Sequence, residues 1–274
     1  MWLKLLMVAA LTYGAVVTAV YVMQTQVFFP TSSVQPAGRL PASAERLEIV
    51  SPSGHSLRGL YIPAAAPGPK RLVVLGFGGN AWNANDAAMY LHNLYPAAEI
   101  VTFHYRGYTP SGGRPSTAAF IADAPLVHDF VRGRFGGTAI VAVGFSIGSG
   151  IVASLASQRP LDGAILVTPF DSLAAVAAAQ YPWLPMRLLL RHRLDAAADL
   201  REVRIPVAII AAGRDKVIPD IRTAALQRVV PNLVFARTIA GAGHNDIYHN
   251  PLFHEAMREA LAQMFESAER YETR

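Results

Sequence analysis

The sequence predicts an α/β fold in which a mainly parallel β-sheet carries helices on both faces, preceded by an N-terminal transmembrane helix. Short, nearly all-apolar runs recur along the chain, and most are followed by an Ala-rich helical stretch. Runs without polar alternation imply strands covered on both faces, which is typical of parallel sheets with crossover helices. A long uncharged segment near the N-terminus predicts the membrane helix.

Composition agrees with one catalytic-size domain plus a membrane segment. The chain has 274 residues, of which 52% are hydrophobic and only 16% charged, and its mean hydropathy is +0.28. That value is high for a wholly soluble protein. The net charge is +5 and the pI is about 9.6, yet the basic residues are scattered among acidic ones. We therefore expect weak attraction to anionic lipid and no nucleic-acid partner.

The N-terminal segment reads as an uncleaved anchor over residues 1–29. It carries no charge from Leu5 to Met23, which as a helix spans roughly 28 Å, close to the thickness of a bilayer core. A cleaved signal peptide or a buried helix fits less well, because the run is long and "QTQVFFP" follows it. Lys4 precedes the segment and the next basic residue is Arg39. The positive-inside rule then places the main domain on the non-cytoplasmic side of a plasma or bacterial inner membrane. The absence of cysteine is compatible with either side.

The remaining elements follow in order. Residues 30–45 are rich in Pro, Ser and Ala and predict a linker to the main domain at 46–274. Residues 46–50 and 56–63 predict an antiparallel hairpin. Parallel strands are then expected at 71–77, 99–105, 138–145, 163–170, 207–213 and 233–239, and a short helical insertion at about 173–200.

Polar residues follow three of these strands, where the active site of a parallel sheet lies. Ser146 stands in "GFSIG" between a strand and a helix, Asp215 follows residues 207–213, and His244 lies in a Gly-rich turn after residues 233–239. A plain turn would also explain Gly and Ser at residues 144–148. The chain order Ser, Asp, His, however, is that of the α/β-hydrolase sheet. An imidazole can accept the serine proton, and a carboxylate can orient the imidazole.

Other acids remain alternatives. Asp171 also follows a parallel strand and is the rival catalytic acid, although capping the next helix is a simpler use. Asp246 is expected to order the His244 loop, and Asp220 and Asp123 to lie on the surface or cap helices.

An oxyanion hole should supply two backbone amides. One is expected from Ile147, directly after Ser146, and the other from "GFGGN", where Gly76, Gly78 and Gly79 allow close approach of the backbone. That loop matches neither a phosphate-binding nor a dinucleotide-binding pattern, and no His/Asp/Glu cluster has metal-ligand spacing. We expect no cofactor and no metal.

Several motifs together resemble the membrane-anchored serine hydrolases of the α/β-hydrolase superfamily, related to the Bem46 and depalmitoylase-like groups. The resemblance covers about residues 28–266 and is carried by "LGFGGN", "FHYRGYTPSGGRPS", "VGFSIGSG", "VTPFDSL", "GRDKVIP" and "GAGHND". It implies that Ser146, Asp215 and His244 form the triad and that the amides of Phe77 and Ile147 form the oxyanion hole. In one departure, Leu75-Gly76-Phe77 stands where relatives begin the loop with His-Gly-Asn.

Two further segments have open interpretations. Arg106 in "YRGY" matches the family and is expected to order the loop beside the site, or simply to ion-pair there. The insertion stretch "YPWLPMRLLLRHR" could face lipid, line an acyl pocket or be an ordinary amphipathic core helix.

These observations predict a membrane-anchored serine hydrolase that cleaves carboxylic esters or thioesters with acyl or lipid-like chains through an acyl-enzyme. The expected partners are that substrate and membrane lipid, with no obligate protein partner. A serine peptidase of the same fold and a non-catalytic membrane scaffold are the alternatives. The scaffold is disfavoured because all three triad residues are present.

Overall fold

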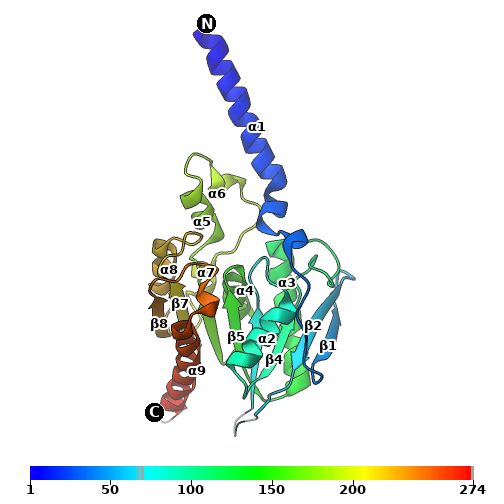
Figure 1. Cartoon of the computed structure of the whole chain (residues 1–274). Coiled ribbons are helices and arrows are strands. Elements are labelled where there is room, and N and C mark those ends of the chain that lie inside the picture. Colours follow the sequence, from blue (N-terminus) through cyan, green and yellow to red (C-terminus); the bar gives the residue numbers. More distant parts are fainter. Residues whose placement is uncertain (67, 69–70, 273–274) are drawn as a thin grey trace.

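The computed structural model describes residues 1–66, 68 and 71–272 (Figure 1). Among these residues, eight strands form one sheet in the order β1-β2-β4-β3-β5-β6-β7-β8. The first two strands, β1 (Glu45–Val50) and β2 (Ser56–Ile62), form the predicted antiparallel hairpin, and β2 also pairs antiparallel with β4. All pairs from β4 to β8 are parallel. The mainly parallel α/β sheet expected from the sequence is therefore confirmed.

The central strands are apolar because both of their faces are covered. They are β3 (Leu72–Phe77), β4 (Glu99–Phe103), β5 (Ala139–Phe145), β6 (Gly163–Val167) and β7 (Val207–Ala212), with β8 (Leu233–Ile239) at the edge. Every residue of β3, β6 and β7 is buried. The edge strand β8 alternates more, since only part of it is covered.

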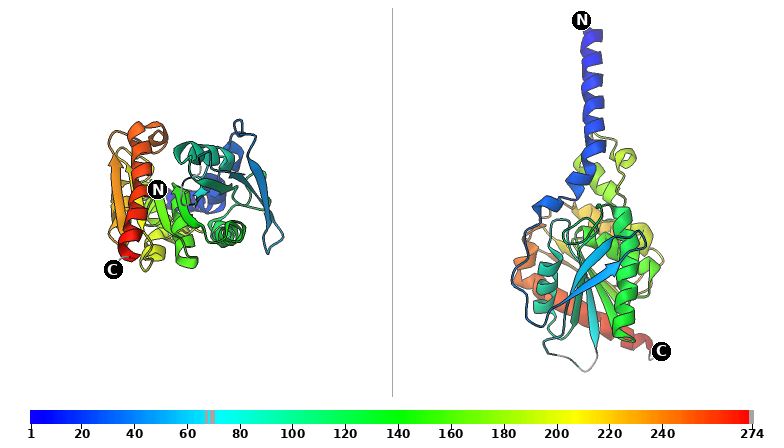
Figure 2. Two further views of the ribbon diagram at one scale, coloured as in Figure 1. Left: turned by 90° about the horizontal axis from the view of Figure 1, so that it is seen from below. Right: turned by 90° about the vertical axis from the view of Figure 1, so that its right-hand side faces the viewer.

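Helices lie on both sides of the sheet (Figure 2). Leu91 of α2 (Ala84–Leu94) and Phe253 of α9 (Pro251–Glu272) pack in one apolar core. The other core holds Phe120 of α3 (Thr117–Phe135) and Ile151 of α4 (Ile147–Gln158), together with residues of α7 (Ala196–Leu200) and α8 (Asp220–Gln227). The two cores clamp the sheet and fix the positions of its loops.

The insertion after β6 is a chain of short helices. It comprises α5 (Leu173–Gln180), α6 (Met186–Leu189) and α7, and it lies beside the helix that leaves the domain (Figure 1). Leu184, Met186 and Leu190 are buried in the core, whereas Trp183 and Leu188 are exposed. Of the three interpretations of this stretch, the core helix therefore applies to these buried residues, while Trp183 and Leu188 face outward.

The N-terminal helix α1 (Trp2–Phe28) projects away from the domain (Figures 1 and 2). Among the described residues, this is the one helix long and apolar enough to cross a membrane, with a window of mean hydropathy 2.1 that is nowhere buried. A signal sequence would pass the same test.

The last turns of α1 belong to the domain. Phe29 is 2% exposed and packs in the core. The Gln24 side chain is buried, accepts from the Arg191 N–H at 2.7 Å and donates to the Leu189 carbonyl at 3.2 Å. A sequence boundary at residue 29 does not capture this docking, because its partners lie more than 160 residues away along the chain.

After α1 the chain passes through a short 3₁₀ turn (Thr31–Ser33) and runs along the domain to β1. The Gly38 N–H donates to Asp86 Oδ1 at 2.9 Å, and Asn83 Nδ2 donates to the Gln35 carbonyl at 3.0 Å. Both partners lie at the start of α2, so the predicted linker is held against the domain surface.

Candidate active site

Ser146 sits on a strained turn between β5 and α4. Its φ of 52° lies in the left-handed region, which a residue with a side chain adopts only at a cost. A Cβ added to Gly144 would lie 2.5 Å from the Gly148 carbonyl oxygen. One added to Gly148 would lie 2.7 Å from the Gly78 carbonyl oxygen and closer still to that of Phe77. Both glycines of "GFSIG" are thus required by close backbone approach, as on a nucleophile elbow.

Ser146, His244 and Asp215 form a chain of hydrogen bonds. His244 Nε2 lies 2.9 Å from Ser146 Oγ, and His244 Nδ1 lies 2.7 Å from Asp215 Oδ2. The side chains of His244 and Asp215 are 9% and 5% exposed. The three residues follow β5, β7 and β8, so the parallel topology brings together groups that are about 100 positions apart in sequence.

The Asp215 carboxylate is held from its other side. Its Oδ1 accepts from the Val217 N–H at 2.8 Å and from the Ile218 N–H at 2.7 Å. These two donors leave Oδ2 free to face the imidazole. The arrangement keeps the proton on Nδ1, so that Nε2 can accept from the serine hydroxyl.

The rival acid Asp171 is engaged elsewhere. Its Oδ2 pairs with Arg222 at 3.0 Å, and its Oδ1 accepts from the Ser172 N–H at 2.7 Å. Ser172, rather than Asp171, caps α5, since its side chain accepts from the Ala175 N–H. The expected capping role for Asp171 is therefore wrong, and the residue is an ion-pair partner.

The other acids also have defined partners. Asp246 Oδ1 accepts from the Gly243 N–H at 2.5 Å and so orders the loop that carries His244. Asp220 is the first residue of α8 and accepts from the Ile221 N–H. Asp123 is 6% exposed and pairs with Arg106, so the expectation of a surface or capping group is wrong for this residue.

The two expected oxyanion donors differ in position. Ile147 is the first residue of α4, where backbone N–H groups have no partner within the helix. Phe77 is the last residue of β3, pairs with Gly144 and is 6% exposed. The part of this loop that lines the cleft is Gly79 to Trp82. Ile147 thus directly follows Ser146, and Phe77 ends β3 against the elbow, since a Cβ on Gly148 would contact its carbonyl oxygen.

Sequence reasoning missed how this loop is held. Tyr105 donates to the Gly78 carbonyl at 2.8 Å, and Tyr108 donates to the Asn80 carbonyl at 2.7 Å. Burial raises the pKa of both phenols, which keeps them protonated as donors. Asn80 Nδ2 donates to the Phe28 carbonyl at the end of α1 at 3.1 Å. The motif "YRGY", which carries both tyrosines, was the available signal.

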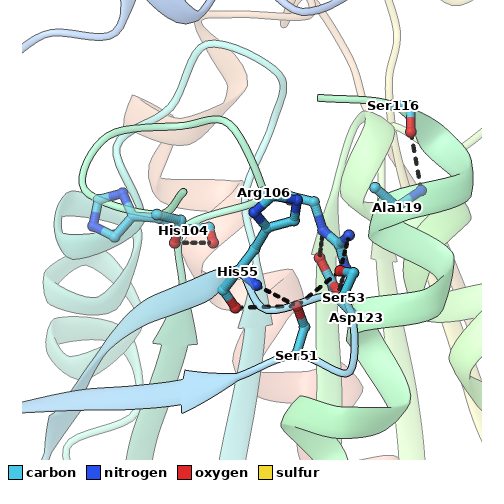
Figure 3. Close-up of polar contacts among 9 residues, drawn as sticks. Ser51, Ser53, His55, His104, Arg106, Ser116, Ala119 and Asp123 are labelled. Atoms are coloured by element: carbon cyan, nitrogen blue, oxygen red, sulfur yellow. Dashed lines mark hydrogen bonds and ion pairs between the residues drawn. The ribbon is translucent and has the colours of Figure 1, made fainter. Parts of the chain in front are cut away.

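Arg106 fastens the segment that carries these tyrosines (Figure 3). Its guanidinium makes two hydrogen bonds to Asp123 of α3 and one of 2.7 Å to Ser53 Oγ in the β1–β2 turn. The bond to the carboxylate raises the pKa of Arg106. Ser51, which accepts from the His55 N–H, completes the turn. Arg106 therefore orders the loop and does not itself line the cleft.

A cleft of about 550 Å³ opens at Ser146 and His244. Three aromatic side chains, Trp82, Tyr90 and Tyr248, line it and pack against Phe145. Burial raises the pKa of Tyr248 to about 12, so this phenol is neutral at physiological pH. Polar groups converge on the cleft from Asn80, Asn245 and His249.

The chain matches known proteins over most of its length. The family profile described as "alpha/beta hydrolase fold" matches residues 72–202. Protein MT2364 of Mycobacterium tuberculosis is 32% identical over 251 residues, which cover 89% of this chain and 88% of that protein. Lysophosphatidylserine lipase ABHD12 of Danio rerio is 26% identical over 54% of this chain and 44% of its own length.

Solved structures share the architecture. The esterase PF2001 of Pyrococcus furiosus superposes with a TM-score of 0.66 at 15% identity, covering 84% of this chain and 96% of the esterase. At that identity the likeness concerns the fold. Together with the sheet order, the elbow and the profile match, the identity to the mycobacterial protein over most of both chains shows that this protein belongs to the α/β-hydrolase family.

Proposed function

We propose that this protein is a serine hydrolase that cleaves carboxylic esters or thioesters of acyl or lipid-like substrates through an acyl-enzyme. The observation that carries the proposal is the hydrogen-bonded chain from Ser146 to His244 to Asp215, set on a strained elbow at the mouth of a cleft. The hydrolase fold and its esterase and lipase neighbours support hydrolysis as the reaction class.

In the proposed reaction, Ser146 Oγ attacks the acyl carbon while its proton passes to His244 Nε2. Asp215 stabilises the imidazolium, which then protonates the departing oxygen or sulfur. A water molecule gives its proton to His244 and attacks the acyl-enzyme, which releases the acid and returns the proton to Ser146. Each proton thus moves between the serine, the imidazole and either the leaving group or water.

The amide of Ile147 and the amide of Asn80 are the proposed oxyanion donors. Asn80 is proposed as an alternative to the predicted Phe77 because its carbonyl and side chain are held by Tyr108 and Phe28, which points to a fixed backbone at the cleft. Gly79 supports this choice, since a Cβ there would lie 3.9 Å from that of Ser146.

Acyl substrates are proposed from the cleft walls. Aromatic side chains on one side of Ser146 suit an apolar chain, because each buries a large area without an unpaired charge. The Danio rerio neighbour is named a lysophosphatidylserine lipase and the Pyrococcus furiosus structure an esterase. These names agree with an acyl ester but do not define the leaving group.

The α1 helix is proposed as a single-pass anchor, as in the Bem46 and depalmitoylase-like proteins that the sequence resembles, with the domain on the non-cytoplasmic side. The exposed apolar surface of α1 supports the anchor. The lone Lys4 before it supports the orientation. Protease added to intact spheroplasts should cut the linker near Arg39. Digestion only after lysis would reverse the orientation.

The serine mechanism is tested with a fluorophosphonate probe on full-length protein in detergent. Wild type and Ser157→Ala should be labelled, because Ser157 lies exposed on α4, whereas Ser146→Ala should not. Hydrolysis of p-nitrophenyl esters of graded length then defines the acyl chain. Labelling that survives in Ser146→Ala, or folded wild type that resists the probe, contradicts the proposal. Hydrolysis of an unactivated peptide amide that Ser146→Ala loses would indicate a peptidase.

A further inference from the structure

A second cavity, of about 610 Å³, lies where α1 meets the domain, and we call it the interface cavity. One wall is the last part of α1, and another is the start of α3 with the segment after α6. Its lining comprises Val22, Thr25, Gln26, Phe29, Thr31, residues 114–118, Arg191 and His192. None of these residues lines the cleft at Ser146.

The charge of the interface cavity is positive. Arg114 and Arg191 line it, and no carboxylate does. Among the described residues, no acid lies within ion-pair distance of either guanidinium. Arg191 stacks over Tyr21 of α1 with 4.9 Å from its guanidinium carbon to the ring centre. The stacking holds one cation against the helix while its N–H donors stay available.

Three of the neutral polar groups of the cavity are already occupied. Thr25 Oγ1 lies 2.9 Å from His192 Nε2, and the His192 ring packs edge-on against Phe29. Ser116 uses its hydroxyl to cap α3 by accepting from the Ala119 N–H (Figure 3). The two guanidiniums are the charged side chains that line the cavity, and their planar forks of donors suit the oxygens of a phosphate.

The depth of the cavity along α1 identifies the source of that phosphate. The apolar run ends at Met23, before Gln24, so Thr25 and Gln26 lie only about 3–5 Å beyond it along the helix. This is the level at which lipid headgroups begin when the apolar run fills the hydrocarbon core. Arg114 and Arg191 stand at the same level because both line this cavity.

The tip of the insertion lies deeper than the interface cavity when α1 spans a bilayer. Tyr13 in the middle of α1 donates to the Trp183 carbonyl at 3.1 Å, so the tip lies alongside the apolar run, about 18 Å along the helix from Thr25. Tyr181, Trp183 and Leu188 are 45%, 58% and 84% exposed there. Aromatic and aliphatic side chains left exposed beside a membrane helix are typical of lipid contact.

We propose that the interface cavity binds the phosphate of an anionic phospholipid headgroup through Arg114 and Arg191. The site is separate from the acyl cleft and does not depend on the serine mechanism. It rests only on the proposed anchoring of α1. Bound lipid would bridge α1, α3 and the insertion, which are the three elements that line the cavity.

The test uses full-length protein in detergent, titrated with phosphatidylglycerol or phosphatidylcholine and followed by native mass spectrometry. Arg114→Gln with Arg191→Gln should raise the apparent Kd for phosphatidylglycerol by at least about tenfold, since both charge-assisted contacts are lost. Arg201→Gln with Arg228→Gln removes the same charge from exposed sites elsewhere and should leave the affinity unchanged. Probe labelling of Ser146 in each variant reports that the domain is folded. If the double variant does not fold, Arg114→Gln and Arg191→Gln are measured singly, and each should bind phosphatidylglycerol more weakly than wild type.

Equal affinity in the cavity variant and the control would overturn the proposal, as would equal affinity of wild type for the two lipids. A soluble glycerol phosphate that binds wild type as tightly as the lipid would show a site for free phosphate, which also refutes it. If carbonate extracts wild type from membranes while the probe still labels Ser146, the anchoring and the lipid site are refuted together and the serine mechanism is not. Loss of labelling in wild type would instead refute the serine mechanism alone.

Discussion

Replacing Asp215 with Asn should abolish most turnover by reversing the tautomer of His244. The Val217 and Ile218 N–H groups both point at Oδ1 of Asp215. In the variant they select the amide oxygen for that position, so the amide NH₂ faces His244 Nδ1. An NH₂ group donates there, which moves the imidazole proton to Nε2, and Nε2 can then no longer accept from Ser146.

The size of the expected fall in kcat follows from the two N–H groups that donate to Oδ1. Flipping the amide to restore the productive tautomer would lose both hydrogen bonds, at about 1 kcal/mol each, or roughly 2 kcal/mol in total. The flipped form would then be populated at about one part in 30. We therefore expect kcat to fall by at least about 30-fold, and by up to about 10⁴-fold if the flipped form does not turn over.

The assay compares kcat and melting temperature of Asp215→Asn and Asp171→Asn with a p-nitrophenyl ester. Asp171 pairs with Arg222 away from the imidazole, so its variant should keep turnover and lose about 0.5–2 kcal/mol of stability. A collapse of kcat in Asp171→Asn, with turnover kept in Asp215→Asn, would refute the reasoning.

Three further outcomes are expected. In thermal melts, Gly148→Ala should lose at least about 1–3 kcal/mol of stability, because the added Cβ meets the backbone of β3. Gly133→Ala, whose added Cβ points into open space on α3, should instead gain about 0.5–1 kcal/mol. Tyr108→Phe should lower kcat several-fold by releasing the Asn80 carbonyl, while Tyr61→Phe, whose hydroxyl donates to Glu99, should leave kcat unchanged in the ester assay. Burial, and then the Asp195 charge, raises the pKa of Asp199 to about 6 from 3.8, so this acid lowers stability as pH rises through that interval. Asp199→Asn should therefore raise the melting temperature at pH 7.5 and not at pH 3, and a uniform effect at both would contradict the raised pKa.

Much of the fold follows from local pattern. Strands such as β3 and β7 are apolar on both faces, and this signal survives without knowledge of what covers them. The placement of Ser146, Asp215 and His244 after three strands was also predictable, because the carboxyl ends of parallel strands share one edge. Their distances support the predicted triad geometry.

Long-range contacts could not be predicted in the same way. The role of Asp123 depends on Arg106, and that of Asp171 on Arg222, each through a pairing between distant elements. Phe77 stays a prediction for the second oxyanion donor, because "LGFGGN" does not show where β3 ends. The docking of Gln24 against Leu189 leaves no periodic signal, since it joins one side chain to one carbonyl.

The bond from Asn80 to the Phe28 carbonyl has a mechanical consequence. A flexible tether would let a catalytic domain sample a wide volume around its attachment point. Here Phe29 is embedded in the core and Asn80 is tied to the helix end, so the described contacts join α1 directly to the loop that lines the cleft. We therefore expect the cleft to turn and tilt with α1. A substrate of the proposed hydrolase would then have to diffuse to the cleft.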